Sequence, residues 1–223
     1  MMTSLNLKGS KMKIALIGAT GYIGSALLDE ALARGHDVTA LVKSPEKLAG
    51  KAGVTAVRAD VLDQAALAEQ LRGMDAVVSA FSGHAQADVY DYYVRGMTAV
   101  IGATKAAGVK RLLVVGGAGS LEVAPGVQLV DTPAFPAQWK ATAEGARQAL
   151  ALLRAEPELD WTMLSPAAHI EPGPRTGVFR LGKDQLLTDA AGESHISLAD
   201  YAVAMLDELE KGAHSRQRFA IAY

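Results

Sequence analysis

Three glycines at intervals of three, Gly18, Gly21 and Gly24, form the pattern with the clearest chemical meaning in this sequence. The apolar segment Lys13–Ile17 precedes them, and an amphipathic segment starts at Tyr22. The first glycine permits a tight turn, the second lets phosphates approach the backbone, and the third lets a helix pack closely on a strand. The helix N-terminus then presents free amides to two phosphate charges. The pattern predicts a dinucleotide site, the alternative being a tight turn that binds nothing.

The end of the second expected strand reads Leu41-Val42-Lys43-Ser44 and contains no carboxylate. Sites for NAD commonly place Asp or Glu here for the ribose hydroxyl, whereas a 2′-phosphate requires a cation. Lys43 and Ser44 can contact a phosphate, so we expect NADP, with NAD still possible. The alternative is that Lys43 is an ordinary exposed lysine.

Further cofactor contacts are expected where the next strands end, because ligands of such sheets lie beyond the carboxyl ends of the strands. Asp60 can accept from the adenine amino group while the backbone at Val61 contacts the ring, or Asp60 is only a turn residue. Ala80 leaves room for the adenosine, and Phe81 lies beside it or in the core. The expected contacts of the glycine-rich turn are Gly18, Thr20, Gly21, Tyr22, Ile23 and Gly24.

Length, composition and net charge limit the classes of protein to which this chain can belong. The chain has 223 residues, half of them hydrophobic, a net charge of −2 and no cysteine. This length suits one domain, and the charge gives no reason to expect nucleic acid or membrane as a partner. Disulfides, thiol catalysis and Cys-type zinc sites are excluded. The polar segment Met1–Lys11 lacks the apolar core of a signal peptide. We expect a flexible leader over residues 1–11, a cytoplasmic location, and one NAD(P)-binding domain over residues 12–223.

Strand-like and helix-like segments alternate along the chain, which predicts a Rossmann-like α/β fold: a doubly wound parallel sheet in three layers. Residues 165–192 hold three prolines and four glycines, so we expect an irregular substrate-side loop there. The expected strands are Lys13–Ile17, Asp37–Val42, Val54–Arg58, Asp75–Ala80, Arg111–Val115, Trp161–Leu164 and Gln217–Ala222. The expected main helices are Tyr22–Arg34, Gln64–Leu71, Asp88–Ala107, Pro136–Ala155 and a helix opened by Ser197.

The sequence resembles the atypical short-chain dehydrogenase/reductase superfamily, within it the NAD(P)H-binding proteins called NADH-flavin reductases. The resemblance rests on the glycine turn, Asp60-Val61 and several separate matches, and it covers nearly the whole chain from Met12. The separate matches are Arg111-Leu-Leu-Val-Val-Gly-Gly-Ala-Gly-Ser-Leu121, Ser165-Pro-Ala-Ala168, Glu171-Pro-Gly173, Arg175-Thr-Gly177 and Asp200-Tyr-Ala-Val203. The chain also resembles the beta-type biliverdin reductase, which reduces flavins. That likeness implies that Pro166-Ala-Ala-His-Ile170 lies beside the nicotinamide, and Gly117 is a further expected cofactor contact.

The sequence departs from that superfamily at its catalytic residues. Classical members use Tyr-x-x-x-Lys to supply a proton, and none of the six tyrosines has lysine four residues later. Gly117 and Ala118 lie where a catalytic serine is expected, and Ser120 comes slightly late. Carbonyl reduction with a tyrosine acid is therefore poorly supported.

Two residues are candidates for catalysis. His169 can donate to an acceptor or orient the nicotinamide, or it only binds loop backbone. Lys140 starts a helix where the superfamily's lysine approaches the ribose, or it is a solvated helix lysine. We expect Glu171 and Arg175 to form an ion pair that fixes the loop, and no metal site. Trp139 is expected to pack, and His84 to face solvent rather than the site.

The leading hypothesis is reduction of a flavin- or quinone-like acceptor by NAD(P)H, since both reacting centres then belong to the ligands. Such a protein must stack the rings and exclude water. One alternative is an NADP-sensing regulator without turnover, and a second is an NAD(P)-dependent epimerase or dehydratase. We expect a small-molecule acceptor as partner, with flavin as a possible substrate. The chain is expected to be a monomer or a homodimer, since helices 88–107 and 136–155 could pair or could be core.

Overall fold

The computed structural model describes residues 10–83 and 87–223. Its central feature is an eight-stranded sheet in the order β10-β12-β8-β5-β4-β1-β2-β3. Seven of these strands are parallel, and β10 pairs antiparallel with β12 at one edge. The strands are β1 (Lys13–Ile17), β2 (Asp37–Val42), β3 (Val54–Arg58), β4 (Ala76–Ser79), β5 (Arg111–Val115), β8 (Asp160–Ser165), β10 (Arg180–Gly182) and β12 (Gln217–Ala222).

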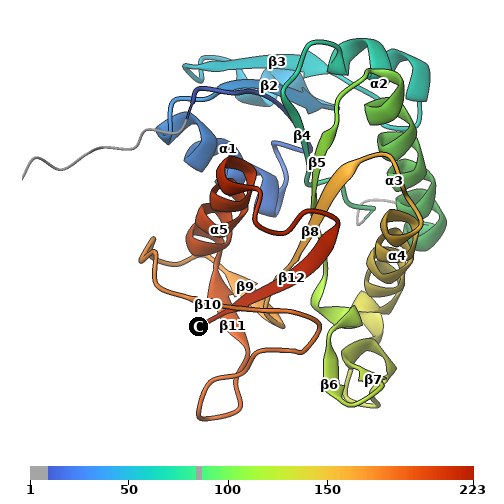
Figure 1. The fold of residues 1–223 in the computed structure, drawn as a ribbon, viewed down its shortest axis with the longest axis vertical. Coiled ribbons are helices and arrows are strands. Elements are labelled where there is room, and N and C mark those ends of the chain that lie inside the picture. The colour runs from blue at the N-terminus through green and yellow to red at the C-terminus, as the bar shows by residue number, and fades with distance from the viewer. Residues whose placement is uncertain (1–9, 84–86) are drawn as a thin grey trace, which may run out of the picture.

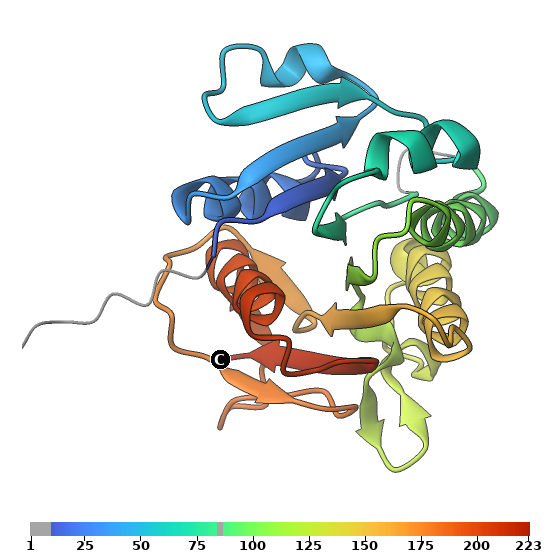
Figure 2. The ribbon, with the colours of Figure 1, turned by 45° about the horizontal axis from the view of Figure 1, so that its top comes forward.

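In the described part of the chain, five α-helices cover the two faces of this sheet, giving the three layers expected (Figures 1 and 2). One face carries α1 (Tyr22–Ala33) and α5 (Leu198–Lys211), which pack on each other. The other face carries α2 (Gln64–Leu71), α3 (Val89–Ala106) and α4 (Ala137–Arg154). The doubly wound Rossmann-like fold predicted from the alternating segments is confirmed.

Each face of the sheet has its own apolar core. Along β1, Ile14 and Leu16 face α1 and α5, while Ala15 and Ile17 face the other helices. This division follows from the strand itself, because successive side chains point to opposite faces. The central strands are buried on both sides, which explains their continuous apolar runs.

Local signals set the helix ends as expected. The Asp63 side chain accepts from the backbone N–H of Ala66 at 3.0 Å and caps α2. The Ser197 hydroxyl accepts from the backbone N–H of Asp200 at 3.0 Å and caps α5, which ends at the left-handed Gly212. These bonds satisfy amides that the first turn of a helix leaves unpaired.

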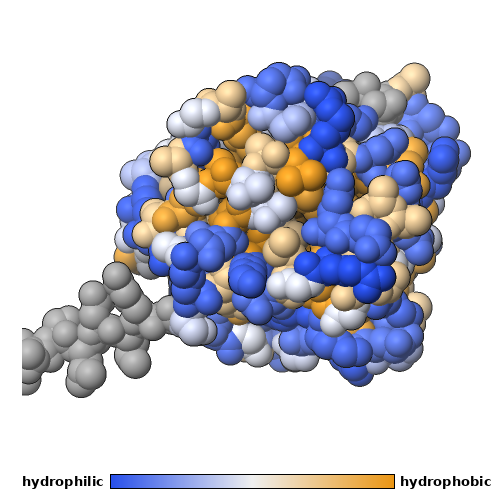
Figure 3. Space-filling model, turned by 90° about the horizontal axis from the view of Figure 1, so that it is seen from above, coloured by the Kyte–Doolittle hydropathy of each residue, from blue (hydrophilic) through white to orange (hydrophobic). Residues whose placement is uncertain are grey.

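At the edge opposite β10, β3 is only partly covered, with no buried residue in its five positions. Figure 3 views the molecule from the side on which β2 and β3 lie in Figure 1. Hydrophobic side chains gather near the centre of that view, inside a rim of hydrophilic ones. Within the described residues no helix is both long and apolar enough to cross a bilayer.

The expectation of irregular structure over residues 165–192 is partly wrong. This stretch contains β9 (His169–Glu171) and the edge strand β10, and β9 pairs in parallel with β11 (His195–Ser197) outside the main sheet. A short hairpin, β6 (Glu122–Ala124) with β7 (Val127–Gln128), was also not expected. Residues 1–9 of the predicted leader lie outside the described residues.

Asp200 connects residues 165–192, which we call the late loop, with α5 and the C-terminus. It is fully buried, and its carboxylate accepts from the amides of Thr176 and Gly177, the Thr176 hydroxyl and the Tyr223 hydroxyl. Burial alone raises the pKa of a carboxyl group, but these hydrogen bonds outweigh that effect and hold the pKa of Asp200 below its ordinary value. The ionised form of Asp200 therefore stabilises the folded chain.

We expect Asp200→Ala to lower the free energy of unfolding by about 3 kcal/mol at neutral pH, because several buried donors lose their acceptor. A lowered pKa gives stability that is present above the pKa of unfolded Asp, about 3.9, and is lost as pH falls through the folded pKa. The difference from the parent should therefore shrink below about pH 4. Urea denaturation across pH measures this. Asp29→Ala, at an exposed aspartate on α1, is the control; equal losses for the two variants would contradict the assignment.

Candidate functional site

The glycine-rich turn joins β1 to α1 at the carboxyl end of the sheet. Gly18 has φ +80°, a left-handed conformation, and its amide donates to the Leu41 carbonyl at 3.0 Å. A side chain at Gly18 would come within 2.7 Å of the Ala80 carbonyl oxygen. Glycine is therefore required twice here, by backbone conformation and by the close approach of β4.

The start of α1 lies against the same turn. A Cβ at Gly24 would overlap the carbonyl oxygen of Gly18, so helix and strand touch through backbone atoms. Gly21 is the N-cap of α1, and because it has no side chain it cannot cap the first turn itself. The turn is thus a bare cradle whose amides can bind an anion, and it fits a diphosphate.

The ends of β2 and β3 carry the polar groups predicted to select the cofactor. Lys43 is exposed and its ammonium lies 5.0 Å from the centre of the Tyr92 ring. Ser44 follows it as the N-cap of a short 3₁₀ helix, Pro45–Leu48. Arg58, the last residue of β3, donates to the Lys43 carbonyl. From its sequence pattern Arg58 is expected only as the last residue of a strand, so this second cation was not expected.

Asp60 acts as a turn residue, one of the two alternatives considered. Its Oδ1 accepts from the amide of Leu62 at 3.0 Å, and its carbonyl accepts from the amide of Asp63 at 3.1 Å. Val61 is buried. This turn holds Asp60 at the carboxyl end of β3, so a contact with adenine stays a prediction.

Phe81 belongs to the core, the alternative that the sequence left open. The side chain is buried and packs 5.8 Å from the ring centre of Tyr93 and 5.4 Å from that of Tyr92. A Cβ at Gly96 of α3 would overlap its ring. The Phe81 side chain is therefore part of the core and does not line a nucleotide site, whereas Ala80 is partly exposed.

The segment after β5 packs under the site and supplies no reactive serine. A Cβ at Gly117 would lie 3.2 Å from the Cβ of Ala146, so this glycine lets α4 approach. Ser120 is buried, and its hydroxyl accepts from the guanidinium of Arg218 at 3.2 Å. Arg218 also donates to the Ser165 hydroxyl at 3.3 Å and to Asp184. Ser120 is thus engaged in a structural contact.

His169 lies on β9, directly after the buried Pro166 and Ala167 and the exposed Ala168. The next residue, Ile170, accepts through its carbonyl from the Tyr22 hydroxyl at 3.4 Å. Because Tyr22 is the first residue of α1, this bond brings β9 beside the glycine-rich turn. The exposed His169 therefore belongs to a strand that borders the predicted cofactor site.

Arg175 pairs with Glu30 of α1, so the expected ion pair with Glu171 is wrong. Two of its nitrogens donate to the two Glu30 oxygens, each at 2.8 Å. Glu30 is buried and also accepts from Arg34. The hydrogen bond from Arg175 is the main cause that lowers the pKa of Glu30, and burial opposes it. A buried carboxylate with two arginine partners attracts Arg175 more strongly than exposed Glu171 does.

Lys140 is exposed in the first turn of α4, close to Trp139, whose side chain is also exposed. Lys140 lies on α4 and His169 on β9, two separate elements of the fold, so a joint role of the two residues stays a prediction. His84 lies outside the described residues.

Two tyrosines near the site are poor proton donors. Tyr93 and Tyr201 are buried, and burial raises the pKa of both phenols above the ordinary value. The Tyr201 hydroxyl donates to the Leu164 carbonyl at 2.7 Å. The sequence has no Tyr-x-x-x-Lys pair, and the burial of these two phenols is a second reason why they are unsuited to donate a proton.

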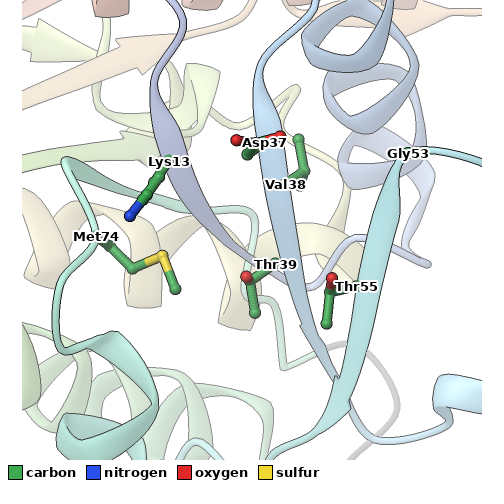
Figure 4. A pocket seen from close by; sticks show the side chains of 7 residues that line it. All are labelled: Lys13, Asp37, Val38, Thr39, Gly53, Thr55 and Met74. Carbon is green, nitrogen blue, oxygen red and sulfur yellow. The ribbon is translucent and has the colours of Figure 1, made fainter.

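A shallow pocket of about 190 Å³ lies away from this site. Figure 4 shows its lining side chains, with Lys13, Asp37 and Thr39 on β1 and β2 among them. Lys13 and Asp37 are the first residues of their strands, so the pocket opens at the amino ends of the sheet. Ligands of parallel α/β sheets bind at the opposite ends.

The family model described as NAD(P)H-binding matches residues 18–209, from the first glycine of the turn into the last turn of α5. The chain belongs to this NAD(P)H-binding family. This family membership agrees with the geometry of the glycine-rich turn, which leaves room for a diphosphate. The cofactor is a nicotinamide dinucleotide.

Solved structures with the same fold carry different provisional names. A protein from Burkholderia pseudomallei named as exported is 48% identical, with TM-score 0.87, over 95% of this chain and 100% of that one. A protein from Bacteroides thetaiotaomicron named as an epimerase is 45% identical, with TM-score 0.90, over 96% and 97%. A protein from Streptococcus pneumoniae named as an NADH-flavin reductase is 36% identical, with TM-score 0.84, over 95% and 99%. Similarity at this level gives the fold and the family, while the names differ in activity.

We expect Gly24→Ala to weaken NADPH binding at least about tenfold, because the added methyl group must push α1 away from the turn that holds the diphosphate. Isothermal titration calorimetry measures the affinity, and circular dichroism with thermal melting separates this effect from unfolding. Ser25→Ala, one residue later and exposed, is the matched control. A folded Gly24→Ala protein with parental affinity would contradict the role of the cradle.

Proposed function

We propose that this protein is an NADPH-dependent reductase that delivers hydride to a planar flavin- or quinone-like acceptor. One observation carries the proposal: the glycine cradle of α1 stands beside β9, which carries the exposed His169. A dinucleotide held by the cradle extends across the carboxyl ends of the strands. Its reactive ring then lies toward β9 and the late loop, where an acceptor can stack.

The residues at this site suit a reaction in which the ligands carry the chemistry. Bound nicotinamide supplies a hydride, and the chain has to position the two rings and exclude water. Tyr22 and Arg175 attach the late loop to α1, so two separate contacts hold this loop beside the helix that follows the glycine-rich turn. His169 is the residue that we assign to donate a hydrogen bond to the acceptor or to orient the ring.

The same residues argue against acid-catalysed carbonyl chemistry. Ser120 is bound by Arg218, and Tyr93 is buried with a raised pKa. Neither Ser120 nor Tyr93 is therefore free to supply a proton to a substrate carbonyl, and none of the six tyrosines has lysine four residues later. Epimerisation or carbonyl reduction would need such a donor, and hydride transfer to a flavin or quinone does not.

One observation also favours a second candidate. The engagement of Ser120 by Arg218 suits a protein that binds NADP and reports its redox state to a partner without turnover. Tight NADP binding with no oxidation of NADPH by any acceptor would favour this regulator over the reductase.

We expect the purified protein to oxidise NADPH in the presence of FMN, FAD or a quinone, which loss of nicotinamide absorbance measures. His169→Ala should lower kcat about tenfold or more by removing a donor at the acceptor, and leave the Kd for NADPH within about twofold. His195→Ala, on the neighbouring strand β11, is the control. Failure of all three acceptors would count against the reductase, and equal kcat values for the two variants against the role of His169.

A further inference from the structure

Trp139, in the first turn of α4, is 51% exposed although it belongs to the face of the helix that packs inward. Side chains on one face of an α-helix recur at intervals of three or four residues. Trp139 continues such a series, which we call the inward face of α4, and the other members are buried: Ala143, Ala146, Leu150 and Leu153. The sequence predicts that Trp139 packs, and half of this residue is open instead.

The inward face of α4 packs on the segment that follows β5. A Cβ at Gly117 would lie 3.2 Å from the Cβ of Ala146, and a Cβ at Gly119 would lie 2.7 Å from that of Ala143. From the first pair to the second, the contact moves about one turn toward the start of α4. Trp139 is the next position on this face, and helical side chains lean toward the N-terminus. Its indole therefore lies beyond Gly119, past the part of the helix that the chain covers.

The first turn of α4 lies at the carboxyl ends of the parallel strands. α4 ends at Arg154, and β8 then begins at Asp160, which lies opposite Arg111 at the start of β5. The last turn of α4 is therefore at the amino ends of the strands, and its first turn, with Trp139, is at the carboxyl ends. Ligands of such sheets bind at these carboxyl ends.

His169 extends from the same edge of the sheet. The Gly116 amide, directly after β5, donates to the Leu164 carbonyl at 2.8 Å, so the segment under α4 lies beside the end of β8. The chain continues from the end of β8 to His169 on β9. Trp139 and His169 thus belong to two segments that adjoin the ends of β5 and β8.

A half-exposed indole at this edge suits a planar aromatic ligand. A ring that covers the indole removes apolar surface from water and gains the attraction between stacked aromatic rings. The gain from burial grows with the area that is covered, so fused rings gain more than a single ring.

We propose that Trp139 stacks on the acceptor and selects acceptors with fused rings, such as an isoalloxazine or a naphthoquinone, over acceptors with one ring. This inference rests on the proposed function, because it concerns the acceptor of the same hydride. In that reaction the acceptor takes a hydride from NADPH and a proton from water, and NADP⁺ is left. Trp139 supplies contact area and no proton, so it acts on the affinity for the acceptor more than on kcat.

The test compares Trp139→Ala and Trp139→Phe with the parent protein, using FMN and menadione, which have fused rings, and duroquinone, which has a single ring. Trp139→Ala should raise KM for FMN and menadione about tenfold, raise KM for duroquinone less than about threefold, and leave kcat within about twofold. Trp139→Phe, which keeps a smaller ring, should raise KM for FMN about threefold and carries the test if Trp139→Ala does not fold.

A second measurement needs no turnover. Stacking on an aromatic ring quenches the emission of FMN, so a titration of FMN with the protein in the presence of NADP⁺ gives the Kd for FMN. Trp139→Ala should weaken this Kd about tenfold and leave the Kd for NADPH, measured by calorimetry, within about twofold.

Gln138→Ala is the matched control, because Gln138 is exposed in the same turn of α4 and lies off the inward face. It should change none of these values. Parental KM and Kd values for FMN in Trp139→Ala, or an equal rise of KM for all three acceptors, would overturn the stacking role while the reductase stands. A parent protein that reduces none of the three acceptors would instead overturn the proposed function.

Discussion

The site depends on one contact between backbone atoms, that of Gly24 with the carbonyl of Gly18. Because a single methyl group would fill this space, the start of α1 lies directly on the turn that ends β1. Gly18 meets the end of β4 in the same way, within 2.7 Å of the Ala80 carbonyl for an added Cβ. The turn is therefore held between two strands and a helix by contacts of the chain itself. Affinity for a diphosphate then costs little ordering of the chain.

The late loop has the opposite character, because polar contacts to distant elements hold it in place. Arg175 reaches Glu30 on α1, Tyr22 reaches Ile170, and Asp200 collects the amides of residues 176 and 177. Each of these contacts is sensitive to charge or to a single hydroxyl group, whereas the cradle is fixed by sterics. The two parts of the proposed site are thus held by different kinds of contact, the glycine-rich turn by backbone packing and the late loop by polar side chains.

Sequence patterns predicted the sheet well because its central strands are buried on both faces. The bounds of β1, β2, β3, β5 and β12 agree with those expected. Strands β9, β10 and β11 were missed because each has only three residues, too few to show a period. The pairing of Arg175 with Glu30 was missed because 145 residues separate the two. Arg58 could have been found, because consecutive strands often lie side by side in such sheets, which would put the end of β3 beside the end of β2.

The buried Arg218 gives the serines after β5 and at the end of β8 a structural role. Burial lowers the pKa of Arg218 and Asp184 opposes this effect, so the guanidinium needs every acceptor nearby. The hydroxyls of Ser120 and Ser165 serve as two of these acceptors. A serine held in this way supports the floor of the site and is a poor partner for a substrate oxygen. The hydride transfer between two bound rings that we propose requires no hydroxyl from this serine, whereas a reaction with an acid catalyst would.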